Sequence, residues 1–119
     1  FDLDADGPGD VDLTMTNSTA NRNEDEGLKV SVTNGGNLNA DVRNSTFNGS
    51  LSDYGITFET EEDPDAAGTL DAVVRNSTVR NNDDGILEAV SEGDEGTVLL
   101  KGGNLKGAIE TDNVIIELG

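Results

Sequence analysis

A short motif that recurs along the chain constrains the fold more than any other feature. The motif is an aliphatic residue, a Thr, Arg or Lys, and then Asn-Ser-Thr or a degenerate version of it. Its copies lie at Met15–Ala20, Val42–Phe47, Val74–Val79 and, in degenerate form, Leu100–Leu105. Successive copies begin 27, 32 and 26 residues apart. Repeats of this size are typical of solenoids, in which each repeat is one coil of a stack.

A second apolar strand follows each copy by about ten residues. These strands are expected at Gly27–Val32, Gly55–Phe58, Gly85–Leu87 and Asn113–Leu118. Alternation assigns one face of each strand to the core. In the third coil Glu88 falls where Val30 and Phe58 lie in the coils before it. We therefore expect either a bulge that turns Leu87 and Ala89 inward or a different register at that point.

The same alternation sorts the side chains of both strands. The first strand is expected to close on the outside with Thr16, Arg43, Arg75 and Lys101. The residues expected to point inward are Leu13, Met15, Ala40, Val42, Ala72, Val74, Val98 and Leu100 from the first strand, and Leu28, Val30, Val32, Ile56, Phe58, Val114, Ile116 and Leu118 from the second. A single coil cannot bury such a face, whereas stacked coils bury a continuous core.

The phrasing of the third repeat, from Asn76 to Ile86, resembles the right-handed parallel β-helix repeats of pectate-lyase-like and bacterial or archaeal surface proteins. The resemblance covers residues 11–119 and implies an all-β, right-handed parallel β-helix of about four coils. We place these coils at residues 11–37, 38–69, 70–95 and 96–119, after an acidic lead-in at 1–10. The alternative is an antiparallel β-sandwich of eight strands, in which nothing would require the Asn-Ser-Thr corners to recur.

Charge and composition limit the function. The chain has 7 Lys and Arg against 25 Asp and Glu, a net charge of −18, and neither Cys nor His. So acidic a surface repels nucleic acid and anionic membranes, and no run of residues is long enough to insert into a membrane. Without His or Cys the commonest bases and nucleophiles are missing, so we do not expect an enzyme. The chain begins at Phe1 without Met, as expected of a processed protein or a piece of a longer one.

The asparagines of the motif have two competing interpretations. Asn tolerates left-handed backbone conformations, and a stacked column of Asn17, Asn44 and Asn76 could hydrogen-bond along the axis inside the corner. Gly102 takes the corresponding place in the last coil. The same three residues, with Asn48, are N-glycosylation sequons. A buried amide cannot carry a glycan, so the interpretations conflict everywhere except at Asn48.

Acidic residues suggest a calcium site at the N-terminus. Carboxylates at alternate positions, followed by glycine turns, are what a hard cation needs from a tightly wound loop. The carboxylates that we assign as metal ligands are Asp2, Asp4, Asp6, Asp10 and Asp12. The segment resembles the calcium loops of EF-hand, dockerin and thrombospondin type 3 proteins, although Leu13 stands where an EF-hand loop has its last ligand. The alternative is a solvated acidic linker.

Further charges are expected to form rows along the stack. Acidic residues precede each second strand, at Glu24–Glu26, Asp53, Asp83–Asp84 and Asp112, and another group lies at Glu61–Asp65. Arg43, Arg75 and Lys101 would form an outward basic row. That row would either bind an anionic saccharide or neutralise carboxylates such as Asp41 and Asp71.

These observations favour a structural module of an extracellular or cell-surface filament, stalk or adhesin, stabilised by calcium. A solenoid has unpaired strands at both ends, and the apolar residues Val114, Ile116 and Leu118 are expected at one of them. We therefore predict a homo-oligomer or filament formed head to tail. A carbohydrate-binding or polysaccharide-lyase-like fragment is the alternative function.

Overall fold

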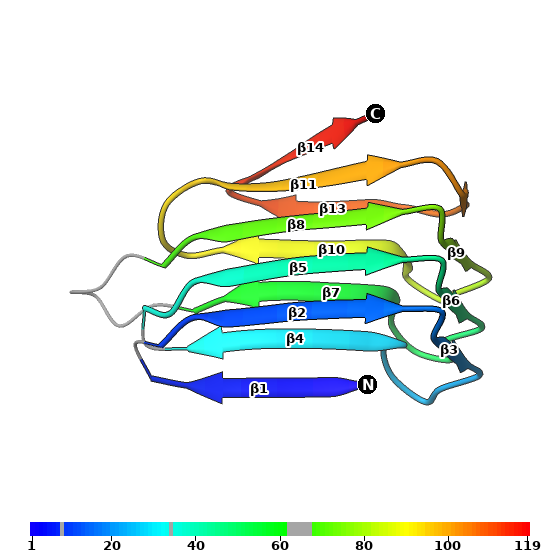
Figure 1. Cartoon of the computed structure of the whole chain (residues 1–119). Coiled ribbons are helices and arrows are strands. Elements are labelled where there is room, and N and C mark those ends of the chain that lie inside the picture. The colour runs from blue at the N-terminus through cyan, green and yellow to red at the C-terminus, as the bar shows by residue number, and fades with distance from the viewer. Residues whose placement is uncertain (8, 34, 62–67) are drawn as a thin grey trace.

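The computed structural model describes residues 1–7, 9–33, 35–61 and 68–119, and these residues form three β-sheets (Figure 1). Sheet A contains β1 (Asp2–Asp6), β4 (Leu28–Thr33), β7 (Tyr54–Thr60), β10 (Gly85–Ser91) and β13 (Ile109–Asp112). Sheet B contains β2 (Val11–Thr16), β5 (Leu38–Arg43), β8 (Leu70–Arg75), β11 (Gly96–Lys101) and β14 (Val114–Leu118). Sheet C contains β3 (Thr19–Asn21), β6 (Thr46–Asn48), β9 (Thr78–Arg80) and β12 (Asn104–Leu105). The described residues include no helix that could cross a membrane.

The chain visits the sheets in a fixed order. It passes from sheet A to B to C and back to A, and each visit adds a strand next to the one laid down before. Every strand pair among the described residues is parallel. This topology is compatible with a parallel β-solenoid, and it rules out the antiparallel sandwich.

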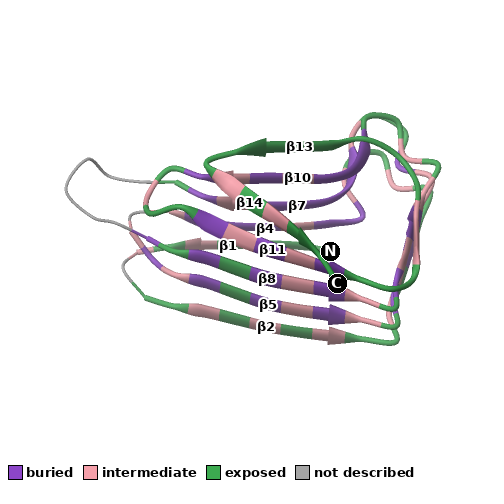
Figure 2. Ribbon diagram, turned by 90° about the horizontal axis from the view of Figure 1, so that it is seen from above, coloured by how far each residue is buried: buried purple, intermediate pink, exposed green. Residues whose placement is uncertain are grey.

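Sheets A and B face each other as two layers, and the short strands of sheet C close one edge between them (Figure 2). The core between the layers is aliphatic except for two phenylalanines, Phe47 and Phe58, which are fully buried. Phe47 comes from sheet C and Phe58 from sheet A. The scarcity of aromatic residues suits a core this thin.

The predicted alternation is confirmed for most strands. In β5 and β8 the inward residues are Leu38, Ala40, Val42, Leu70, Ala72 and Val74, and all are buried. Leu87 and Ala89 of β10 point inward, opposite Ile56 and Phe58. Glu88 therefore lies on the outside of sheet A, beside Thr57. The pairing keeps one offset from Gly85 opposite Tyr54 to Ser91 opposite Thr60, so of the two expectations for this coil the different register is confirmed and the bulge is not.

The expected strand at Asn113–Leu118 was placed in the wrong sheet. Val114–Leu118 pairs with β11 in sheet B and therefore begins a further coil. The strand that lies over β10 is the polar segment Ile109–Asp112. The sequence favoured the more apolar strand, but the fourth coil is short and its sheet A strand is exposed, so apolar character was a poor guide.

One of the expected acidic segments contains a strand, and the structure describes only part of another. The lead-in expected at residues 1–10 contributes strand β1, which pairs with β4 along its whole length. Of the acidic group at Glu61–Asp65, only Glu61 is among the described residues.

Candidate functional site

The corner between sheets B and C is built by asparagines in a left-handed conformation. Asn17, Asn44 and Asn76 have φ of 52°, 51° and 50°, and Gly102 has φ of 66°. A residue with positive φ turns the chain sharply at low cost only if it is Gly or Asn. The sequence-based expectation of a left-handed Asn corner is confirmed.

The buried ladder at this corner is formed by serines, so the expectation of a buried Asn column was wrong. The backbone N–H of Ser18 donates to Ser45 Oγ at 3.1 Å, and that of Ser45 donates to Ser77 Oγ at 3.2 Å. Each hydroxyl in turn donates to the backbone carbonyl two residues earlier. Ser45 and Ser77 are 2% and 1% exposed. Because the left-handed residue redirects the chain, the next side chain points inward.

The three asparagines are exposed at the surface. The conflict between a buried amide and a glycan therefore disappears at Asn17, Asn44 and Asn76. Asn48 is half-buried, and its Oδ1 accepts a hydrogen bond from Asn81 at 3.0 Å. Glycosylation at these four sequons stays a prediction.

The five carboxylates assigned to calcium lie on two strands and the turn between them. Asp2, Asp4 and Asp6 alternate along β1, and Asp12 lies in β2. Asp10 Oδ1 accepts a hydrogen bond from Asn37 at 2.7 Å, and Asp12 Oδ1 accepts one from Asn39 at 3.0 Å. The described residues contain no group of three or more carboxylates placed to hold a metal ion. The structure thus does not bring the five together, and calcium binding stays a prediction.

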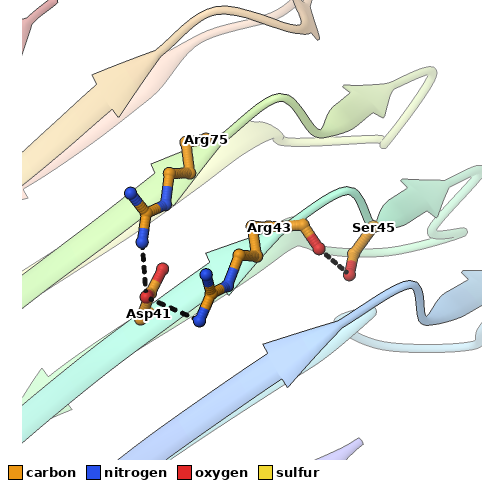
Figure 3. A network of polar contacts seen from close by, with 4 residues as sticks. All are labelled: Asp41, Arg43, Ser45 and Arg75. Carbon is orange, nitrogen blue, oxygen red and sulfur yellow. Dashed lines mark hydrogen bonds and ion pairs between the residues drawn. The ribbon is translucent and has the colours of Figure 1, made fainter.

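The basic row on the outside of sheet B is partly neutralised. Asp41 Oδ2 accepts from Arg75 at 2.7 Å and lies 3.5 Å from Arg43, so one carboxylate bridges two coils (Figure 3). Asp71 and Lys101 form no ion pair with any described residue. The contacts of Asp41 are those expected if the arginines neutralise carboxylates. Saccharide binding by Arg43, Arg75 and Lys101 stays a prediction.

The outside of sheet A carries an acidic row. Glu88 and Glu110 are Cα partners on neighbouring strands. Burial raises the pKa of Glu88, and the nearby charges of Asp53, Glu110, Glu59 and Glu26 raise it further. The carboxylates of this row therefore repel one another, and nearby positive charge does not fully offset the repulsion.

The acidic residues of this face also raise the pKa values of Tyr54 and Lys29. Tyr54 Oη donates to Glu110 at 2.5 Å, which together with burial raises the pKa of Tyr54 to about 12. Lys29 lies 3.8 Å from Glu59. Burial lowers the pKa of Lys29, but the charges of Glu59, Glu26, Asp4 and Asp2 outweigh it and raise that pKa overall.

The acidic residues before each second strand lie in the loops from sheet C to sheet A. Backbone hydrogen bonds stack these loops: Asp84 N–H donates to the carbonyl of Asp53, and Leu51 N–H to that of Asn23. Leu51 itself is 68% exposed. Asp112 does not belong to this group, because it pairs with Val90 within sheet A.

The residues assigned to self-association lie at the end of sheet B. Val114 and Ile116 are half-buried against the core and Leu118 is 81% exposed. At the other end, Leu3 of β1 is 39% exposed. The core column therefore reaches the surface at both ends of the stack.

One hollow in the surface was not predicted from the sequence. A hollow of about 560 Å³ is lined by Asn21, Arg22, Asn48, Gly49 and Asn81, at the edge of sheet C. Its residues come from three successive coils, and each lies at the end of β3, β6 or β9 or directly after it. Arg22 and Asn81 have positive φ there, at 56° each.

Comparison with known proteins identifies no relative. No model of a protein family matches the chain, and neither a curated protein nor a solved structure matches it significantly.

Proposed function

We propose that this chain is a structural module of an extracellular or cell-surface filament, stalk or adhesin. In this proposal it is a right-handed parallel β-helix of about four coils, and copies stack head to tail. The resemblance of the repeat to surface-protein solenoids supports the extracellular setting. A saccharide-binding function has less support, since Arg43 and Arg75 already bind Asp41.

The observation that carries the proposal is the state of the two ends. Each sheet ends in a strand with one paired edge: β13, β14 and β12 at one end, β1, β2 and β3 at the other. Unpaired N–H and C=O groups of such strands can pair with another chain. Leu118 at one end and Leu3 at the other extend the core column, so stacking would bury apolar surface as well as pair backbone groups.

Head-to-tail contacts are heterologous, because a different surface of each copy takes part. When the rotation between copies does not close a ring, such contacts give a filament. The net charge of −18 opposes stacking, so salt should promote it by screening.

The test is sedimentation velocity of two lysine variants in 1 M NaCl. Ile116→Lys places a charge at the inward position of the end strand and should abolish association. Ile115→Lys is the matched control, because Ile115 points outward and is 47% exposed. Wild-type protein that remains monomeric at every concentration, or two variants that behave alike, would contradict head-to-tail stacking.

A further inference from the structure

The few cations of this acidic chain gather on one side. Four segments, residues 13–23, 42–52, 72–82 and 96–109, contain no Asp or Glu. Each segment runs from sheet B through sheet C. They hold six of the seven basic residues: Arg22, Arg43, Arg75, Arg80, Lys101 and Lys106. We call this the basic side.

Most of these cations pair with no carboxylate in the described part of their own chain. Arg43 and Arg75 bind Asp41, but Arg22, Arg80, Lys101 and Lys106 form no ion pair with any described residue. A chain with 25 carboxylates could easily have paired these groups, so their acceptors are best sought on another molecule.

The outside of sheet A, which we call the acidic face, is complementary to the basic side. It carries Asp2, Asp4, Glu59, Glu88, Glu110 and Asp112, with Lys29 as its one cation among the described residues. Burial and then crowding by like charges raise the pKa of Glu88 there. Excess negative charge on one side and unpaired positive charge on another are what opposite faces of an interface need.

The spacing of the two rows also matches. Each contributes about one charge per coil, and coils in a parallel stack repeat at the strand spacing of about 4.8 Å. The unpaired cations and the acidic row both extend through the last two coils: Arg80 and Glu88 belong to one, Lys106 and Glu110 to the next. Two copies with parallel axes and no axial offset therefore place these charges at the same heights.

We propose that the basic side of one copy binds the acidic face of a second copy, side by side and with parallel axes. This lateral contact is independent of head-to-tail stacking and would connect neighbouring stacks. The contact is heterologous, so it closes into a ring or continues according to the angle between copies. At 0.1 M salt the Debye length of about 10 Å is shorter than the smallest molecular dimension of 23 Å, so the facing rows act more strongly than the distant charges.

Charge-swapped variants test the contact. The first is Lys101→Glu with Lys106→Glu, all on the basic side, and the second is Glu88→Lys with Asp112→Lys on the acidic face. Both leave the hydrogen bond between Tyr54 and Glu110 in place. Protein from a host without N-glycosylation is examined by sedimentation velocity, both in the wild-type background and in Ile116→Lys, which removes head-to-tail stacking.

In the Ile116→Lys background, which isolates the lateral contact, the protein should associate at 0.1 M NaCl and dissociate at 1 M, the opposite of head-to-tail stacking. Each charge-swapped variant alone should bind itself at least about tenfold more weakly, because like charges then face each other. A mixture of the two should recover association, since both new contacts pair opposite charges. An Ile116→Lys protein that is monomeric at every salt concentration, or a mixture that stays monomeric, would overturn the proposal.

A matched pair of variants separates the site from net charge. Lys101→Ser with Lys106→Ser and Asn39→Glu with Thr69→Glu each change the net charge from −18 to −20, by removing two cations or adding two anions. Only the first pair lies on the basic side, since Asn39 and Thr69 are exposed and lie outside its four segments and outside sheet A. Equal loss of association in both would show that net charge alone matters, and would also overturn the proposal.

Discussion

The backbone N–H of Ser45 donates to the hydroxyl of Ser77 at 3.2 Å, although 32 residues separate the two in sequence. The same bond joins Ser18 to Ser45 one coil earlier. Each buried hydroxyl therefore satisfies a backbone group of the neighbouring coil, and the corner locks the coils in register.

Ser45→Ala should lower the free energy of unfolding by about 1–3 kcal/mol, because the half-buried N–H of Ser18 loses its acceptor. Ser18→Ala is the control, since no backbone N–H of the described residues donates to its hydroxyl. Chemical denaturation of both variants measures the difference. Equal stability of the two would show that the ladder contributes nothing.

Asn76→Ala should destabilise the fold by about 1–2 kcal/mol, because alanine has no low-energy left-handed conformation. Asn76→Gly should cost much less, because glycine adopts a φ of 50° freely. Since the Asn76 side chain is exposed, the cost should come from the backbone and not from a lost amide hydrogen bond. If Gly is as costly as Ala in urea denaturation, the side chain has a role of its own.

Glu88→Gln should stabilise the protein at pH 7. The folded-state pKa of this carboxyl is raised, so the ionised form is disfavoured in the folded state and the protonated form is favoured. The free energy of unfolding of the wild type should therefore gain from Glu88 as the pH falls from neutral through the raised pKa. The advantage of the Gln variant should shrink over the same range. Denaturation curves at pH 7 and pH 4.5 check both the sign and the window.

Tyr54 is the single tyrosine of the chain, so its ionisation can be followed by ultraviolet absorbance without interference. In the folded protein the transition should lie near pH 12. Between the ordinary tyrosine pKa of 10 and this value the unfolded state loses the proton first, so stability falls as the pH rises. Glu110→Gln should move the transition toward pH 10, because the charged acceptor is removed. A folded wild type that titrates near pH 10 would contradict the hydrogen bond.

Calcium at millimolar concentration should raise the melting temperature if the N-terminal carboxylates bind it, because a ligand of the folded state stabilises that state. Asp4→Ala with Asp6→Ala should reduce the gain. Thermal melts in calcium and in a chelator make the comparison. Identical melts would leave these residues with the roles that the structure gives them, on the surface of β1.

The sequence predicted the repeat and the inward faces because both depend on local spacing. Val42 and Val74 are two positions before an Asn-Ser-Thr corner, and alternation alone places them in the core. It failed at the corner itself, because alternation cannot be continued through a residue with positive φ. Asn44 was expected inside the corner but is exposed, and the next residue, Ser45, is buried there instead. The short strands of sheet C were not recognised as a separate sheet.

The last coil shows a second limit. Ile109–Asp112 is polar and exposed, so nothing in its composition marks it as a strand that pairs with β10. The charge pairs of the outer faces were only partly predictable. Asp41 was identified as a partner of the arginines, but the bond between Tyr54 and Glu110 joins residues 56 apart in sequence. No local pattern could have shown it.

The ladders of sheets A, B and C join each coil only to its neighbours, and this determines how the chain can fold. A lone coil would close a loop of about 27 residues, the separation of Ser18 and Ser45, and gain no partner strand for it. Nucleation therefore needs two adjacent coils at once. The coils around Phe47 and Phe58 bury the largest side chains and are where we expect it to begin. The folded stack then grows by one coil at a time toward each end, because each coil contacts only its neighbours.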